Sequence, residues 1–146
     1  MRFMVIIKST PESEKEGFVP DPQLFAEMGK FNEELIKAGI VLAMDGLQPS
    51  SKGARVKFSG KSATVVDGPF TEAKELVAGF WIWQVKSLEE AIEWVKRCPF
   101  AALDVDSEIE IRQVGEMEDF ASILTEEEIQ YKKAKRAQLP NQTFNK

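Results

Sequence analysis

The sequence predicts an α+β domain in which two β-α-β units are separated by a β-hairpin. Three observations support this fold class. Six short segments are rich in β-branched and aromatic residues and are bounded by turn residues. Two segments with apolar residues at helical spacing each lie between two of these strands. The length of 146 residues is that of one ordinary domain.

The six expected strands differ in how strongly the residues predict them. The segment from Val77 to Val85 is the most strand-like, and its mixture of aromatic and aliphatic residues indicates burial on both faces. Ser59-Gly60-Lys61 joins two of the others as a hairpin. The strands are expected at residues 2–8, 40–44, 54–58, 62–66, 77–85 and 109–114.

Capping residues define the three expected helices. Asp21-Pro22 begins the first, which carries an apolar stripe and ends at Gly39. Ser87 and Glu90 form a capping box for the second, in which the Glu90 carboxylate accepts a hydrogen bond from the Ser87 amide. Pro99 ends that helix. Thr125 begins a polar C-terminal helix that extends to about Gln138, and residues 141–146 are expected to fray. The element order is the ferredoxin-like βαββαβ plan, with an extra hairpin and a C-terminal helix.

Composition excludes several classes of function. The chain has no histidine, so Ser-His-Asp triads, Cys-His pairs and histidine-ligated metal sites are ruled out. The single cysteine, Cys98, fits a reducing cytoplasm and a structural role better than a nucleophilic one. A net charge of −5 argues against nucleic-acid binding, and no apolar run is long enough to span a bilayer. Without Walker or Rossmann glycine patterns, we expect no cofactor and no metal.

Two helices on one face of a sheet leave the other face uncovered. Phe80, Trp81, Ile82 and Trp83 occupy both faces of one strand, so apolar side chains are expected on the open side. We therefore predict a homodimer formed through the sheets, with Trp81 or Trp83 as candidate interface residues. The alternative is that the C-terminal helix folds back over the open face.

One motif carries a family resemblance. Asp67-Gly-Pro-Phe-Thr-Glu-Ala-Lys-Glu75, with Gly79-Phe80 and Arg97-Cys98-Pro99 downstream, resembles the branch of the YCII-related family that is named for its DGPF motif. The resemblance covers residues 1–120 and leaves 121–146 as a C-terminal helical extension. It implies a dimeric α+β-barrel fold and a protein partner in signalling by extracytoplasmic-function sigma factors. A His-Asp pair proposed as catalytic in other members has no counterpart in this chain.

The same motif supplies the candidate site residues. Asp67 and Asp45 are the candidate catalytic carboxylates, and Asp67, Glu72, Lys74 and Glu75 are the candidate ligand-binding residues. In the structural alternative, Asp67 accepts hydrogen bonds from the following backbone and Phe70 anchors the turn. Two functions follow. The first is a homodimeric module that binds a small polar ligand or regulates a partner. The second is a small enzyme that uses carboxylate acid/base chemistry in a barrel pocket.

Overall fold

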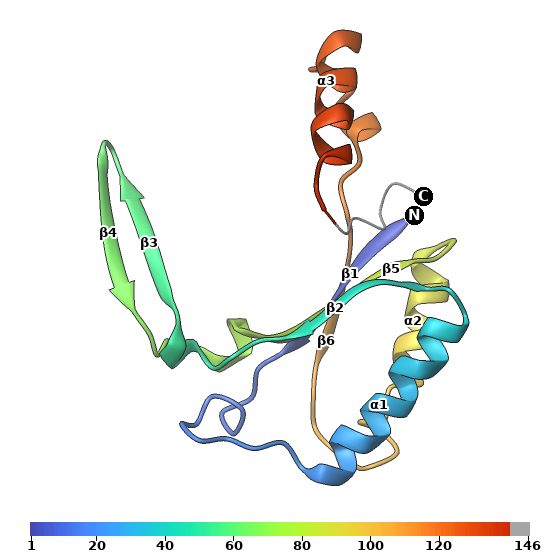
Figure 1. Cartoon of the computed structure of the whole chain (residues 1–146). Coiled ribbons are helices and arrows are strands. Elements are labelled where there is room, and N and C mark those ends of the chain that lie inside the picture. Colours follow the sequence, from blue (N-terminus) through green and yellow to red (C-terminus); the bar gives the residue numbers. More distant parts are fainter. Residues whose placement is uncertain (141–146) are drawn as a thin grey trace.

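A four-stranded antiparallel sheet forms the centre of the computed structural model, which describes residues 1–140 (Figure 1). Its strand order is β2-β5-β1-β6, the order of a ferredoxin-like sheet. The strands are β1 (Arg2–Lys8), β2 (Val41–Gly46), β5 (Val77–Gln84) and β6 (Ile109–Gln113). The predicted α+β class and element order are therefore confirmed. The end that was expected to fray, residues 141–146, lies outside the described part.

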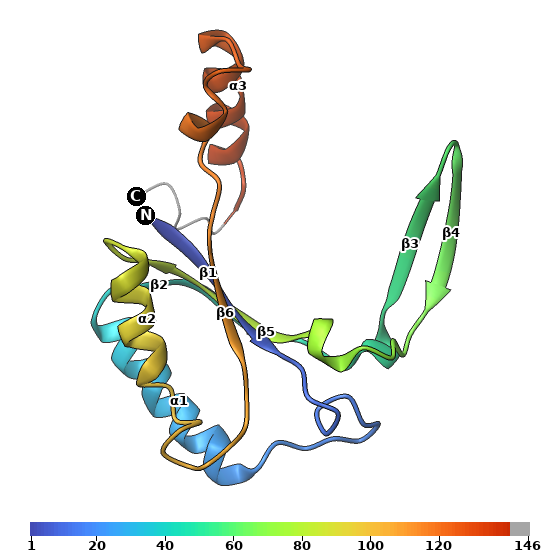
Figure 2. The same cartoon turned by 180° about the vertical axis from the view of Figure 1, so that it is seen from behind.

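Two helices, α1 (Pro22–Lys37) and α2 (Leu88–Lys96), cover one face of this sheet (Figure 2). The Asp21 carboxylate accepts a hydrogen bond from the Gln23 amide, and Gly39, with φ +72°, ends the first helix as predicted. Ser87 caps α2, but Glu90 accepts from the Lys86 amide rather than from the serine amide. The second helix therefore has a cap one residue longer than the predicted box.

The core lies between these helices and the sheet. Trp83 is fully buried at its centre, and Trp81 packs edge-on against Phe31 with ring centroids 6.1 Å apart. The remaining core is formed by buried residues from the sheet, from both helices and from the segments next to them: Phe3, Val5, Leu35, Ile40, Val85, Ala91 and Cys98. Because Trp81 and Trp83 are 3% and 0% exposed on this side, neither is available on the open face. The expectation that a tryptophan lies on a sheet interface is therefore wrong for this chain.

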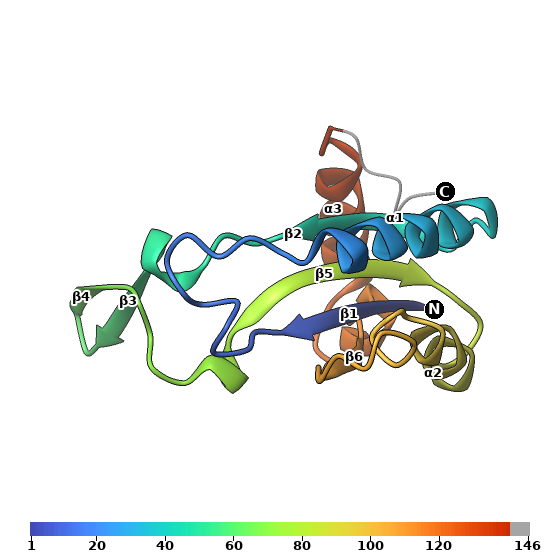
Figure 3. The same ribbon diagram turned by 90° about the horizontal axis from the view of Figure 1, so that it is seen from below.

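The opposite face of the sheet carries Met4, Ile6, Phe80 and Ile82, all partly exposed. Strand register places them together, since Met4 pairs with Ile82 and Ile6 with Phe80. Two elements project from this side, away from α1 and α2: the hairpin β3 (Ala54–Ser59) with β4 (Ser62–Asp67), and α3 (Glu126–Ala137) (Figure 1). Seen from below, the hairpin extends well beyond the sheet (Figure 3). Since α3 stands away from the sheet, it does not cover the open face as the alternative prediction required.

Short connections complete the chain. Three 3₁₀ turns, η1 (Ser50–Lys52), η2 (Ala73–Glu75) and η3 (Met117–Phe120), follow β2, β4 and β6. The Arg2 guanidinium donates two 2.8 Å hydrogen bonds to Glu116 just before η3, which hold the pKa of Glu116 below its usual value. This ion pair holds the segment before α3 against β1. Thr125 and Glu128 form the predicted capping box at the start of α3.

No helix within residues 1–140 is both long enough and apolar enough to cross a membrane.

Replacing Gly79 with valine is expected to destabilise the protein. A Cβ atom at this buried position of β5 would lie 3.1 Å from the Asp45 carbonyl oxygen and 3.4 Å from the Gly46 Cα. Overpacking of this kind costs about 1–3 kcal/mol, and denaturant unfolding should show a loss of that size.

Gly29→Ala is the matched control, because a Cβ atom there, within α1, has no neighbour within 4 Å. This control should leave stability unchanged or raise it by about 0.5–1 kcal/mol. Equal stability of Gly79→Val and the wild type would show that the close approach is unimportant.

Candidate functional site

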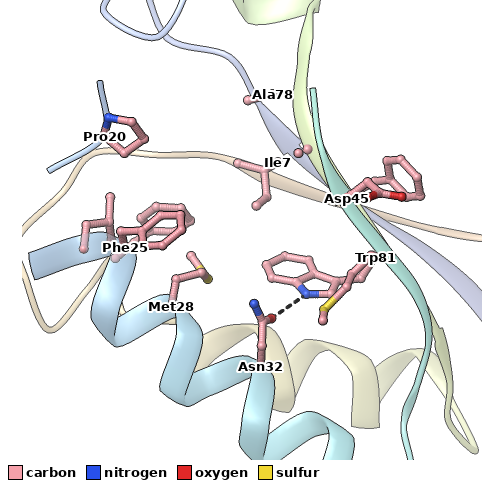
Figure 4. Close-up of a pocket in the computed structure, with 14 residues that line it drawn as sticks. Ile7, Pro20, Phe25, Met28, Asn32, Asp45, Ala78 and Trp81 are labelled. Carbon is pink, nitrogen blue, oxygen red and sulfur yellow. Dashed lines mark hydrogen bonds between the residues drawn. The ribbon is translucent and has the colours of Figure 1, made fainter. Parts of the chain in front are cut away.

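A cavity with largely apolar walls lies between the N-terminal half of α1 and the β2–β5 edge of the sheet (Figure 4). It has a volume of about 490 Å³, which is within the range of small-molecule sites. Its walls are contributed by α1, by three strands, by Pro20 and by Phe100. The lining residues are Ile7, Pro20, Leu24, Phe25, Met28, Asn32, Met44, Asp45, Gly46, Ala78, Gly79, Phe80, Trp81 and Phe100. We call this space the apolar cavity.

One hydrogen-bonded pair, Trp81 and Asn32, places polar groups at the wall of the apolar cavity. The Trp81 indole N–H donates a 2.8 Å hydrogen bond to Asn32 Oδ1. Since the indole can only donate, this bond fixes which end of the Asn32 amide is the oxygen. The amide nitrogen then points toward the interior of the cavity (Figure 4), and it has no hydrogen-bond partner within the described residues. A fixed donor is thus available at an otherwise apolar wall.

The apolar stripe of α1 continues past the core into this cavity. Phe31 and Leu35 are buried, whereas Met28 is partly exposed and Phe25, one turn nearer the start, is 73% exposed. The sequence predicts a single core face for all of these positions. Phe31 and Leu35 belong to the core and Met28 packs against its edge, whereas Phe25 lies beyond the core and forms a wall of the cavity.

Asp45 contributes to the cavity through its backbone rather than through its carboxylate. It pairs with Phe80 on β5, and its side chain points away from the cavity (Figure 4). Because cross-strand partners share a face, the carboxylate lies on the open side of the sheet. The structure thus places this candidate catalytic residue outside the largely apolar space.

The other candidate residues of the motif are exposed. Asp67 ends β4 opposite Ala54, at the base of the hairpin, while Glu72 precedes η2 and Lys74 and Glu75 lie within it. In the part of the chain that is described, no hydrogen bond or ion pair joins these four side chains to one another or to Asp45. These residues lie near the end of β4 and in η2, but no hydrogen bond or ion pair within residues 1–140 joins their side chains.

Packing and backbone hydrogen bonds hold the DGPF turn in place. Gly68 lies directly against the Ser50 carbonyl, where any side chain would overlap the backbone. The Ser50 hydroxyl accepts a hydrogen bond from the Phe70 amide (3.0 Å) and donates one to Glu14 Oε2 (2.6 Å). The Arg55 guanidinium lies 3.8 Å from the Phe70 ring centroid.

These contacts favour the structural interpretation of the motif, but Gly68 and the Phe70 amide hold the turn rather than the Asp67 carboxylate. Asp67 accepts no hydrogen bond from a described residue, and Phe70 is partly buried under Arg55 instead of entering the core. The sequence assigns no role to Glu14 or to Ser50, which lie 36 positions apart, although Ser50 ends the Asp45–Ser50 segment that shares in the family resemblance. It also assigns none to Asn32, because a polar residue on a helix gives no signal of its own.

Cys98 is a buried thiol. Burial raises its pKa to about 11, and a hydrogen bond involving the backbone of Phe100 opposes this shift only in part. The group is therefore a protonated thiol at neutral pH, as expected for a structural cysteine rather than a nucleophile.

Replacing Gly68 with alanine is expected to disrupt the turn and loosen the hairpin. The added Cβ atom would overlap the Ser50 carbonyl oxygen, and backbone cannot move aside as a flexible side chain can. The cost should be at least about 1–3 kcal/mol, measured by denaturant unfolding, with faster amide exchange in β3 and β4.

Gly53→Ala is the control, since its Cβ atom would be 3.6 Å from the same oxygen, an ordinary contact distance. The packing role of Gly68 would be refuted if both variants unfolded at the same denaturant concentration.

Comparisons with known proteins place this chain in a family. The uncharacterized protein R00369 of Rhizobium meliloti (strain 1021) is 28% identical over 76 residues, which are 52% of this chain and 61% of that protein. Thus the match spans less than two thirds of the relative's length. A solved structure of 5-chloro-2-hydroxyhydroquinone dehydrochlorinase (TftG) from Burkholderia phenoliruptrix AC1100, in complex with 2,5-dihydroxybenzoquinone, aligns with a TM-score of 0.44 at 17% identity, covering 82% of this chain and 99% of that one. The YCII-related domain matches residues 1–118, and the chain therefore belongs to the YCII-related family.

Proposed function

We propose that this protein is a homodimeric module that binds a small, largely apolar or aromatic molecule in the apolar cavity. The observation that carries the proposal is the combination of a 490 Å³ space with apolar walls and one oriented amide donor on Asn32. Sites for small molecules commonly have this composition, in which a few placed polar groups orient a ligand that apolar walls retain.

The exposure of Phe25 supports a binding role. A phenylalanine that is 73% exposed at the rim of a cavity gains little from its position in the free protein. A ligand in the cavity would cover part of the ring and would add an aromatic contact.

The alternative enzyme function requires a carboxylate near the bound molecule. Asp45 is the candidate that borders the cavity, and its side chain points away (Figure 4). Asp67 lies at the hairpin base and does not line the cavity. This placement favours binding over acid/base chemistry. Cytoplasmic location and a partner in transcriptional signalling remain expectations from the sequence and the resemblance.

The homodimer is supported by three surfaces on one side of the sheet that stand apart from one another within residues 1–140. The first is the apolar open face, and the second is the hairpin, on which Val56 pairs with Val65 and Phe58 is 80% exposed. The third is α3, with Tyr131 exposed. A two-stranded hairpin with a bare apolar face is at best marginally stable alone in water. A second copy placed over the open face would lie between the hairpin and α3 (Figure 1), so α3 belongs to this proposed interface.

Ligand binding can be tested with indole as the probe, followed by chemical-shift changes in a two-dimensional NMR spectrum. Indole should shift the amides of residues that line the apolar cavity. Phe25→Ala should weaken binding by about 3- to 10-fold, as the loss of one aromatic contact predicts, with little change in melting temperature because Phe25 is exposed.

Phe120→Ala is the matched control, because it removes an exposed phenylalanine that neither lines the cavity nor lies on the open face or the hairpin. Binding of indole to the two variants with equal affinity would contradict the proposed site.

The dimer can be tested by introducing a charge at the centre of the open face. Ile82→Glu should give a folded monomer in sedimentation velocity at concentrations where the wild type is a dimer, because an unpaired carboxylate in an apolar interface costs several kcal/mol. Ile36→Glu, on the exposed side of α1, should remain dimeric. A monomeric wild type, or a dimeric Ile82→Glu variant, would contradict an interface through the sheets.

A further inference from the structure

A second cavity of about 390 Å³ adjoins the apolar cavity. Pro20, Gly46 and Ala78 line both spaces, so the two share a wall formed by β2, β5 and the loop before α1. The second cavity differs in composition, since Ser9, Ser13, Glu14 and Gln48 are among its lining residues. We call it the polar cavity.

Two side chains of the polar cavity have oxygen atoms that accept no hydrogen bond from the described residues. Ser9 is 4% exposed, and its hydroxyl has no hydrogen-bond partner in the described chain. A buried hydroxyl without a partner is unfavourable, which makes this position unusual for a purely structural serine.

Glu14 is the second of these groups. Its Oε2 accepts hydrogen bonds from the Ser50 amide and hydroxyl, whereas its Oε1 accepts none from residues 1–140. The two bonds to Ser50 hold the carboxylate in a fixed position at the wall.

The charge of the polar cavity selects the chemistry of its occupant. Among the lining residues within 1–140, Glu14 is the only ionisable one, and no lysine or arginine of that range contributes to the wall. An anionic group would therefore be repelled, while an ammonium group would find a carboxylate and a hydroxyl oxygen as acceptors. The apolar cavity beside it offers aromatic and aliphatic contacts for the rest of the same molecule.

We propose that the natural ligand is a small aromatic or aliphatic amine, with its apolar body in the apolar cavity and its ammonium group in the polar cavity against Glu14 and Ser9. This inference rests on the proposed function and adds the ligand class. Ser9 and Glu14 bind the amine, and the N–H groups of the Asn32 amide face the ring of an aromatic ligand as N–H···π donors.

Three probes with the same ring system separate the two proposals: indole, tryptamine and indole-3-acetate, which at neutral pH are neutral, cationic and anionic. Titration calorimetry on the full chain should show tryptamine binding about tenfold or more tightly than indole, the factor expected for a hydrogen bond to a charged group. Indole-3-acetate should bind more weakly than indole.

Two variants test the assigned residues. Glu14→Gln keeps an acceptor for Ser50 and should make the affinities for tryptamine and indole about equal. Glu12→Gln, at an exposed residue paired with Lys15, should retain the tighter binding of tryptamine. Ser9→Ala deletes a hydroxyl that has no hydrogen-bond partner among residues 1–140, so the variant should fold normally and weaken tryptamine binding by about threefold.

The possible results have distinct meanings. Equal affinity for indole and tryptamine, or an unchanged preference in both Glu14→Gln and Ser9→Ala, would overturn the amine assignment and leave the apolar site standing. Failure of all three probes to bind would overturn the proposed function as well.

Discussion

The alternation of side chains along β5 is the constraint on which the rest of this structure depends. This strand lies inside the sheet between β1 and β2, and each of its faces is set by a period of two residues. Trp81 and Trp83 point toward the helices and fill the core, while Phe80 and Ile82 point to the opposite side. A shift of one residue in register would exchange these sets and expose both tryptophans. The core and the open face therefore have the same origin.

The apolar cavity lies where the residues of β5 are small. Ala78 and Gly79 continue β5 beyond Trp81, and Gly46 pairs with Gly79 on β2. Opposite them, α1 still presents Phe25 and Met28, so large side chains on the helix face a wall with little volume on the strands. Close-packed interiors fill such spaces with side chains, and this one is left unfilled. Glycine in β5 thus serves both the close approach of two strands and the space above them.

The sequence predicts most of the fold because its local signals agree with each other. Asp21, Gly39 and Thr125 give the helix ends, and the first strand is predicted with its observed bounds. The faces of β5 could not be assigned, because the strand has no polar residue from Val77 to Trp83 and so shows no alternation over that stretch. The cavity was also beyond prediction, since Phe25 and Phe31 have the same helical spacing and differ only in what lies beneath them.

The DGPF motif and the candidate site are connected by Ser50 and Glu14 rather than by the carboxylates of the motif. Gly68 packs against the Ser50 backbone, the Phe70 amide donates to the Ser50 hydroxyl, and that hydroxyl donates to Glu14. Glu14 is in turn part of the wall of the polar cavity. A turn that looks like a binding motif in the sequence therefore acts as a positioning element for a residue more than 50 positions earlier. The absence of a side chain at Gly68 and the backbone amide of Phe70 provide this link. A search for charged residues in the motif therefore points to the exposed side of the turn.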